Sequence, residues 1–504
     1  MVFKAPAKIR LPRGAAVSHM HYLACDLGAE SGRLMLGSLA HGRLELEELH
    51  RFPNGPVETE LGLCWEVDRL FGELRAGLKM AAARGVEIKS ISCDAWGLDY
   101  LLLGRDGAVM EPAFSYRDGR NQRGMERVLD AVTWEEIYEE TGIQQMPINT
   151  LNQLAAETPE RLEQATRFIP LGDGFNYLLS GEARAEVSLA STTQMYNPRT
   201  GGWSGKLLQA MGWPCEIFPE LIQPGTRLGR LKPELADESG LGGIEVIACC
   251  SHDTGSAVVA VPATGVDWAY LSSGTWSLIG VELPAPIINE QSRTLNFTNE
   301  IGYGNTVRLL RNCIGMWLLA ESRRAWAAEG LELDYTDLTR LASEAEPFAA
   351  LIDPSDEGFF KPSHMPSAIR DFCRETGQFA PETPGAVVRC ALESLALLYS
   401  RRLREAESLT GRRIQRLHVV GGGSRNDLLN QFTANACGVE VLAGPVEATA
   451  LGNVLVQAIA LGDLPDLAAA REAVGASMDV TCFQPAESQA WAAAAERFES
   501  LVSD

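Results

Sequence analysis

The tetrapeptide Asp253-Thr254-Gly255-Ser256, inside the stretch SHDTGSA at residues 251–257, is the first motif that could carry chemistry. Aspartic proteases present a catalytic carboxylate in a sequence of this kind, and their chemistry needs two aspartates that share a proton. A two-lobed protease would carry a second Asp-Thr-Gly or Asp-Ser-Gly, and this chain has neither. A protease that works as a dimer of half-sized chains would be much shorter than 504 residues. The sequence therefore disfavours a protease.

Three glycine-rich and serine-rich turns, each after a predicted strand, could bind phosphate. They read DLGAESGR (26–33), LSSGTWSLIG (271–280) and VVGGGSRN (419–426). Backbone N–H groups in such turns can hold phosphate oxygens without a lysine. Standard nucleotide motifs are missing, because GGWSGKL has the wrong glycine spacing for a P-loop and the chain has no G-x-G-x-x-G or H-R-D. Each turn alone could be an ordinary hairpin, so only the combination favours a phosphate site.

The elements that position these motifs alternate between strands and helices. In the first third we predict strands at 22–28, 33–39 and 45–52, a helix at 66–85, a strand at 88–97, a hairpin at 100–110 and a capped helix at 133–142. Later we predict a buried strand at 244–250, a hairpin at 268–283, helices at 385–409, from Ser424, and at 449–462, and strands at 417–423 and 439–444. This order indicates an α/β fold with mixed sheets and suggests an internal duplication. Asp253 follows the buried strand, where open α/β sheets bind ligands.

Composition excludes several classes of protein. With 66 acidic residues against 44 Lys and Arg, the net charge is −22, so nucleic acid and anionic membranes are not expected partners. The eleven cysteines contain no C-x-x-C pair, which favours reduced thiols in a cytoplasmic protein over disulfides or zinc. No apolar run is long enough to span a membrane. Residues 1–20 are expected to be a loose extension.

In this order the motifs resemble the FGGY carbohydrate kinases, a family of the sugar kinase, hexokinase and actin superfamily. The matching stretches are DLGAESGR, CDAWGLDYLLL, SYRDGR, TGIQQMPINTLNQL, STTQMYN, SHDTGSAVVA, AYLSSGTWSLIG, RNCIGMWLL and HVVGGGSRNDLLNQ. They extend from about residue 22 to 465 and are jointly specific. The resemblance implies two ribonuclease H-like domains around a central ATP and sugar cleft, with a sugar-binding domain at 21–262 and a nucleotide-binding domain at 263–504.

The resemblance also implies roles for individual residues. The ATP phosphates would be lined by Ala29, Glu30, Ser31, Gly32, Arg33 and Thr275. Gly422 would contact the adenosine end, and Asp26 would hold Mg²⁺ through water. Glu30 and Ala320 depart from the Ser or Thr and the Gln that relatives often carry, which leaves nucleotide selectivity open.

For the sugar, the resemblance implies contacts from Gly97, His252, Asp253, Thr254 and Asn312. Asp253 would accept the proton of a sugar hydroxyl as that oxygen attacks the γ-phosphorus of ATP. In SYRDGR, Arg117, Asp118 and Arg120 could either bind the sugar or form an exposed turn.

Within the family the motifs are most similar to those of kinases that form L-rhamnulose 1-phosphate in rhamnose catabolism. The implied substrates are therefore a small ketose and ATP. A kinase for L-fuculose or another ketose is the alternative within this class. An actin-type or heat-shock-type ATPase without sugar kinase activity is the alternative from another class. The sequence leaves the oligomeric state open.

Overall fold

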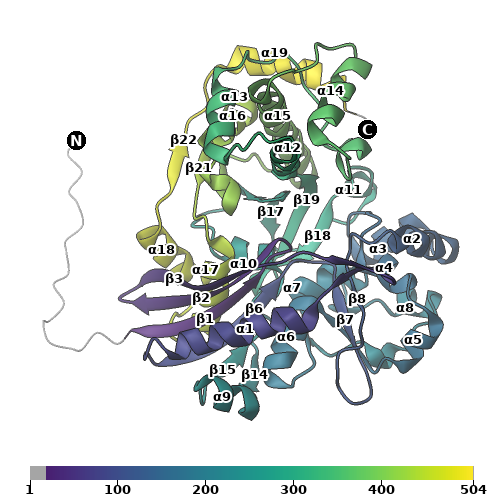
Figure 1. The fold of residues 1–504 in the computed structure, drawn as a ribbon, viewed down its shortest axis with the longest axis vertical. Helices are drawn as coiled ribbons and strands as arrows, with labels where there is room; N and C mark the ends of the chain where they lie inside the picture. The colour runs from purple at the N-terminus through teal and green to yellow at the C-terminus, as the bar shows by residue number, and fades with distance from the viewer. Residues whose placement is uncertain (1–18, 503–504) are drawn as a thin grey trace, which may run out of the picture.

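Two mixed β-sheets organise residues 19–502, the part of the chain that the computed structural model describes (Figure 1). The predicted extension at 1–20 lies outside the described residues except for its last two, and Met20 already begins the first strand. No helix of residues 19–502 is long and apolar enough to cross a membrane. The two sheets fix where the motifs can meet.

The amino-terminal sheet consists of a meander followed by two further strands. Among the described residues its order is β14 (Arg227–Arg230), β15 (Glu245–Ile247), β6 (Ile88–Ala95), β1 (Met20–Leu27), β2 (Ser31–Ala40) and β3 (Arg43–Pro53). Strands β1 to β3 are antiparallel, whereas β6 is parallel to both β1 and β15. The predicted meander at 22–52 is confirmed. Because side chains alternate along a strand, Leu23 and Cys25 enter one apolar core while Tyr22 and Ala24 enter another.

The carboxyl-terminal sheet repeats this arrangement. Within the described part its order is β18 (Thr298–Ile301), β19 (Val307–Ile314), β17 (Trp276–Leu283), β16 (Trp268–Ser273), β20 (Arg416–Val420), β21 (Glu440–Ala443) and β22 (Thr481–Phe483). Strands β16, β17 and β19 form the antiparallel part, and β16, β20 and β21 are parallel. Both sheets thus have the strand order 3-2-1-4-5 of a ribonuclease H-like fold. The predicted α/β class with two such units is confirmed.

Helices cover both sheets, and some of them lie between the two. One face of the amino-terminal sheet packs against α1 (Val67–Ala82), α6 (Leu171–Ser180) and α9 (Pro233–Ser239). The other face packs against α10 (Asp253–Val259), α17 (Ala448–Ala460) and α18 (Leu467–Ser477). The carboxyl-terminal part adds α11 (Glu290–Thr294), α12 (Trp317–Ala328), α13 (Tyr335–Glu344), α14 (Met365–Glu375), α15 (Pro384–Thr410), α16 (Asp427–Cys437) and α19 (Ser488–Glu499). Helix α10, which begins at Asp253, contacts strands of both sheets.

An additional layer of short elements lies beside the amino-terminal sheet (Figure 1). Its helices are α2 (Arg120–Ala131), α3 (Trp134–Thr141), α4 (Thr150–Ala155), α5 (Pro159–Gln164), α7 (Val187–Ala190) and α8 (Gly205–Ala210). Its strands are β4 (Val57–Thr59), β5 (Gly62–Trp65), β7 (Tyr100–Leu103), β8 (Ala113–Phe114), β9 (Arg167–Pro170), β10 (Ala185–Glu186), β11 (Tyr196–Asn197), β12 (Gly202–Trp203) and β13 (Leu221–Ile222). The predicted capping box of α3 is present, since Thr133 Oγ1 accepts from Glu136 N.

Several predicted boundaries are wrong. The helix expected at 66–85 ends at Ala82, and the strand expected at 417–423 ends at Val420. The strand expected at 244–250 ends at Ile247, because Cys249 N donates to the side chain of Ser92 on β6 and not to a backbone carbonyl of that strand. The helix expected from Ser424 begins at Asp427, since Ser424 Oγ donates to Gly421 O and Asn426 caps the helix. The division into domains at residue 262 stays a prediction.

Candidate active site

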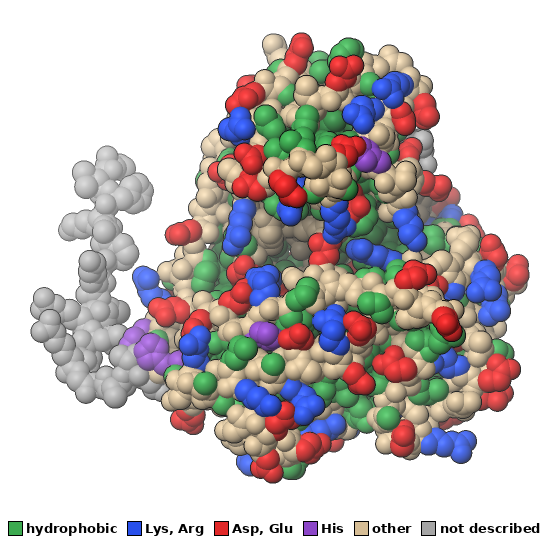
Figure 2. Space-filling model, viewed as in Figure 1, with side chains coloured by type: hydrophobic (Ala, Val, Ile, Leu, Met, Phe, Trp, Pro, Cys, Tyr) green, Lys and Arg blue, Asp and Glu red, His purple; other side chains and the backbone are tan. Residues whose placement is uncertain are grey.

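A cavity of about 410 Å³ lies between the two sheets, and both halves of the chain line it. Figure 2 shows the molecule hollowed between its upper and lower parts. The predicted site residues that line the cavity are Asp26, Ala29, Glu30, Ser31, Arg33, Gly97, His252, Asp253, Thr254, Thr275, Asn312 and Gly422. The structure thus brings together residues that are up to about four hundred positions apart in the chain.

Gly32 is the predicted site residue that is not among those lining the cavity. A Cβ atom at this position would lie 2.2 Å from the ring of Phe52, its neighbour on β3. The glycine therefore allows β2 and β3 to pack closely around Phe52. Its predicted contact with phosphate stays a prediction.

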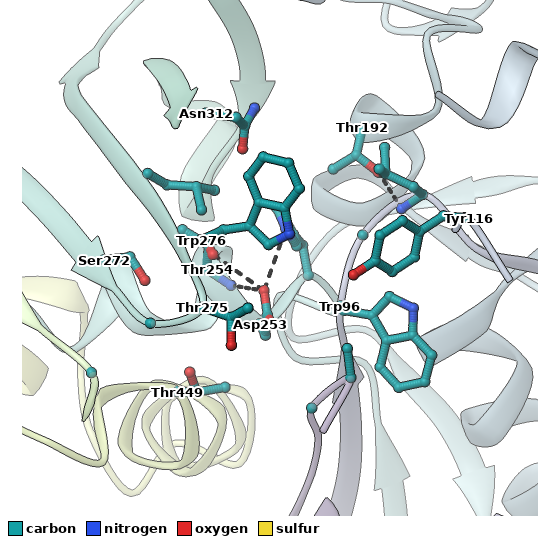
Figure 3. Close-up of a pocket in the computed structure, with 18 of the residues that line it drawn as sticks. Trp96, Tyr116, Thr192, Asp253, Thr254, Ser272, Thr275, Trp276, Asn312 and Thr449 are labelled. Atoms are coloured by element: carbon teal, nitrogen blue, oxygen red, sulfur yellow. Dashed lines mark hydrogen bonds and ion pairs between the residues drawn. The ribbon is translucent and has the colours of Figure 1, made fainter. Parts of the chain in front are cut away.

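Asp253 lies at the centre of the cavity, where its carboxylate is 30% exposed (Figure 3). Its Oδ1 accepts from Thr254 N at 2.5 Å and from Thr254 Oγ1 at 3.2 Å, and His252 Nε2 lies 3.4 Å away. Burial, and then the nearby Asp26, raise the pKa of Asp253 above its ordinary value. A carboxylate with a raised pKa is a better proton acceptor than an exposed aspartate.

Asp26 is the second carboxylate of the cavity and forms an ion pair with Arg33. Arg33 Nη2 and Nε lie 2.8 and 3.1 Å from Asp26 Oδ2, and Arg33 Nη1 binds Glu447. The guanidinium charge is thus already balanced by two carboxylates. The contact with Glu447, which directly precedes α17, carries no signal in the sequence.

Asp94 is a functional candidate that sequence reasoning missed. It is the register partner of Asp26 on the parallel strand β6, and Asn453 Nδ2 of α17 donates to its Oδ2 at 2.6 Å. Its Oδ1 is buried without a hydrogen-bond partner. Burial, and then the nearby Asp26, raise the pKa of Asp94 well above its ordinary value. The signal available in the sequence was an aspartate near the carboxyl end of each of two predicted strands.

The acidic pair Asp26 and Asp94 fits a magnesium ion that is shared with a phosphate ligand. Among residues 19–502 no group of three or more His, Cys, Asp or Glu could hold a metal ion. Mg²⁺ is commonly bound by one or two carboxylates together with substrate phosphates and water, so it does not need such a group. The unpartnered Oδ1 of Asp94 is consistent with a cation arriving with its ligand.

The three glycine-rich turns meet at one side of the cavity. Gly421 has φ +82°, and a Cβ atom on Gly423 would lie 1.9 Å from Ser273 Oγ, so the turns after β16 and β20 touch only because these residues are glycines. From the opposite sheet, Glu30 Oε1 accepts from Thr275 Oγ1 at 3.3 Å. Residues of all three turns, from both halves of the chain, therefore line one space.

Aromatic and amide side chains surround the other side of the cavity. Figure 3 shows Trp96, Tyr116 and Trp276 near Asp253, with Asn312 above them. Asn312 Nδ2 donates to Gln144 Oε1 at 3.2 Å, so its Oδ1 can accept from a ligand hydroxyl. This pattern of apolar walls and few polar groups is typical of a small-molecule site.

Two residues of SYRDGR have structural roles. Arg120 is buried and pairs with Glu157 at 3.2 Å. Asp118 accepts from Leu63 N at 2.6 Å and from Arg120 N at 2.7 Å. Arg117 Nε donates to the hydroxyl of Tyr116, a residue that lines the cavity, at 2.9 Å, and Arg117 itself is not among the lining residues.

The class of the protein follows from sequence comparison. Residues 22–260 match the N-terminal domain and residues 269–461 the C-terminal domain of the FGGY family of carbohydrate kinases. The chain belongs to this family and is an ATP-dependent sugar kinase, which rules out the protease interpretation of Asp253-Thr254-Gly255.

Within this family, the chain is similar over most of its length to several individual proteins. The chain is 45% identical over 487 residues to a rhamnulokinase of Bacteroides thetaiotaomicron, covering 96% of this chain and 99% of that protein. It is 41% identical over 466 residues to a rhamnulokinase of Enterococcus faecalis, covering 92% and 94% of the two chains. Among solved structures, a xylulose kinase from Rhodospirillum rubrum has a TM-score of 0.77 at 19% identity, covering 95% of this chain and 98% of that one. Plasmodium falciparum glycerol kinase has a TM-score of 0.73 at 14% identity, covering 97% and 100%. These structures support the fold alone.

Proposed function

We propose that the protein transfers the γ-phosphoryl group of ATP to O1 of L-rhamnulose in rhamnose catabolism. The observation that carries this proposal is the single cavity that joins Asp253 to three phosphate-type turns. The similarity to rhamnulokinases over most of both chains supports the choice of sugar.

Asp253 is the proposed general base. Although its pKa is raised, a carboxylate is too weak a base to deprotonate an alcohol in advance. The O1 proton therefore passes to Asp253 as, or after, the bond between O1 and the γ-phosphorus forms. ADP leaves with the electron pair of the broken bond between the γ-phosphorus and the bridging oxygen.

ATP is proposed to lie across the three turns. The phosphates would contact Ala29, Glu30, Ser31, Gly32, Arg33 and Thr275, and the adenosine end would contact Gly422. Because Arg33 is paired with Asp26 and Glu447, backbone N–H groups supply most of the phosphate donors in this proposal.

Magnesium is proposed to bind together with ATP, with Asp26 holding it through water and Asp94 beside it. When bound, the ion would neutralise charge on the phosphates. This chain's own contribution is two buried carboxylates that otherwise repel each other, one of them held by Asn453.

The sugar is proposed to lie between Asp253 and the aromatic walls. Gly97, His252, Thr254 and Asn312 would contact its hydroxyls, and Trp96, Tyr116 and Trp276 would cover its apolar faces. In this proposal residues 21–262 form the sugar-binding domain and residues 263–504 the nucleotide-binding domain. A cytoplasmic location, where ATP is available, is part of the same proposal.

Sugar-dependent release of ADP tests the proposed function. With L-rhamnulose, L-fuculose, L-xylulose and D-xylulose as acceptors, we expect the highest kcat/KM for L-rhamnulose, with the phosphate assigned to O1 by phosphorus NMR. L-Fuculose has the same methyl group, so discrimination against it must come from the hydroxyls, which a hydrogen-bonding pocket can distinguish strongly. A kcat/KM about tenfold higher for another ketose would contradict the assignment of L-rhamnulose as the substrate. A rate of ADP release that no sugar changes would contradict the sugar kinase activity itself.

A further inference from the structure

Two charged side chains of the carboxyl-terminal sheet contact Nδ1 of His252, the ring nitrogen that faces away from the cavity. Arg308 on β19 has its Nη2 3.0 Å from His252 Nδ1, and Glu300 on β18 has its Oε2 3.3 Å from the same nitrogen. The guanidinium and the carboxylate lie 3.1 Å apart. The other ring nitrogen, Nε2, lies 3.4 Å from Asp253 Oδ1 and faces the cavity beside Gly97.

The pair is almost completely buried. Arg308 is fully buried and Glu300 is 4% exposed, and Arg308 Nε and Nη2 each donate to Ile301 O at 3.2 Å. Burial alone would raise the pKa of Glu300, but the Arg308 guanidinium beside it holds the pKa below its ordinary value. Tyr270 and Cys250 also interact with this cluster, and Glu282 interacts with both of them. Since a buried ion pair costs desolvation energy, its place against a ligand-facing histidine invites a functional explanation.

The chemistry of arginine determines the state of the ring. A guanidinium can only donate hydrogen bonds, so His252 Nδ1 must accept the one at 3.0 Å. A neutral imidazole that accepts at Nδ1 carries its proton on Nε2. The Nε2–H group then points into the cavity, toward Asp253 and the proposed place of the sugar.

We propose that Arg308 is a positioning residue that keeps His252 neutral with its proton on Nε2, and that Glu300 acts only by pairing with the Arg308 guanidinium. In this state His252 donates to Asp253 or a sugar oxygen but does not place a full positive charge beside the base, which would weaken it. The inference rests on the proposed function, because it assigns a purpose to the contact between His252 and Asp253.

The two partners have different parts. Without Arg308, the Glu300 carboxylate faces Nδ1 alone and attracts a proton to it, so the ring becomes an imidazolium between Glu300 and Asp253. Without the charge of Glu300, the guanidinium still faces Nδ1 and opposes protonation. Removing Arg308 should therefore change the pH dependence of kcat/KM for the sugar. Neutralising Glu300 should leave that pH dependence unchanged.

The test compares kcat/KM for the sugar from pH 5.5 to 9 in wild type, Arg308→Gln and Glu300→Gln. In Arg308→Gln we expect the acidic limb to move upward by about one pH unit or more, with activity recovering at high pH and KM for ATP unchanged. In Glu300→Gln the acidic limb should stay where it is in wild type. An unmoved limb in folded Arg308→Gln, or an equal shift in both variants, overturns the proposal.

A matched control separates this role from loss of stability. Arg389 and Glu393 of α15 form a comparable buried pair at 2.8 Å, and Arg389 Nη1 likewise donates to backbone carbonyls. Arg389→Gln should lower the unfolding temperature without moving the acidic limb. If the acidic limb of kcat/KM shifts as far in Arg389→Gln as in Arg308→Gln, the shift reflects lost protein stability and not the state of His252. That result would overturn the proposal.

Nitrogen-detected NMR of the histidine rings gives a readout that needs no substrate. With seven histidines in the chain, the His252 signals can be assigned by their loss in His252→Asn. We expect a neutral ring protonated on Nε2 in wild type and in Glu300→Gln. Protonation on Nδ1 in wild type would contradict the inference even if the protein proved inactive on every sugar, so the two failures are distinguishable. If Arg308→Gln does not fold, the position of the His252 ring proton in wild type and in Glu300→Gln still tests the proposal.

Discussion

Near the reacting centre, the size of single residues matters as much as their chemistry. Gly97 lies against side chains that are proposed to contact the sugar, and a Cβ atom there would be 3.3 Å from His252 Nε2 and 3.4 Å from Thr192 Oγ1. A methyl group would therefore push His252 or the ligand out of place. For Gly97→Ala we predict that kcat/KM for the sugar falls on the order of 10- to 200-fold, mainly through KM, while KM for ATP stays unchanged.

Gly119→Ala is the matched control for this prediction, because Gly119 lies outside the cavity and a Cβ atom there would contact nothing within 4 Å. It should have the kinetics of wild type. An unchanged KM for the sugar in Gly97→Ala would mean that the sugar does not lie against this position.

Residues inside continuous motifs could be predicted from the sequence, and residues brought in by topology could not. Asp253 was found because Asp-Thr-Gly is a recognisable sequence. Asp94 is buried beside Asp26 only because β6 is parallel to β1 in a register that sets the two residues opposite each other. Arg308 and Glu300 come from strands beyond the predicted hairpin at 268–283, and neither residue is part of a matching stretch, although RNCIGMWLL begins shortly after Arg308.

At the scale of elements, long periodic segments were predicted well and their ends less well. The meander at 22–52 and helix α15 follow from local patterns of apolar residues. The end of β15 depends on a hydrogen bond from Cys249 N to Ser92 Oγ, which a distant part of the chain provides, so it has no local signal. The start of α16 is set locally, by the bond from Ser424 Oγ to Gly421 O and by the cap at Asn426.

Strand β20 carries a buried histidine that should make the protein sensitive to acid. His418 is 2% exposed, and both of its ring nitrogens lack hydrogen-bond partners. Burial, and then the charges of Arg416 and Arg471, lower its pKa to about 4. The unfolded chain binds this proton below about pH 6.5 but the folded chain does not, so stability falls as the pH drops from about 6.5 toward 4. We predict a loss from this group of about 2 kcal/mol in the free energy of unfolding at pH 5 relative to pH 7.5.

Chemical denaturation of wild type and His418→Leu at these two pH values measures this contribution. The variant should lose less stability on acidification than wild type by about the predicted amount. His41→Asn, which removes an exposed histidine from a turn with positive φ, should behave as wild type. Equal losses in wild type and His418→Leu would contradict the assignment.

At the scale of the whole molecule, neither half has a complete site. The amino-terminal sheet supplies Asp26 and the first turn, with Asp94 buried beside Asp26, and the carboxyl-terminal sheet supplies the other two turns and the pair behind His252. Helices α10 and α17 lie between the sheets, so Asp253 at the start of α10 is held by both halves. This arrangement suits phosphoryl transfer, in which the protein mainly positions the reactants and stabilises charge.

The central claim is that Asp253 accepts the proton of the sugar hydroxyl in a reaction that needs ATP. The most direct test is single-turnover phosphoryl transfer from labelled ATP to L-rhamnulose by Asp253→Asn, with nucleotide binding measured separately by calorimetry. The amide keeps the shape of the side chain but cannot take a proton, so we predict a rate lower by on the order of 10² to 10⁴ with ATP binding retained. Sugar-dependent transfer at more than about a tenth of the wild-type rate would contradict the account.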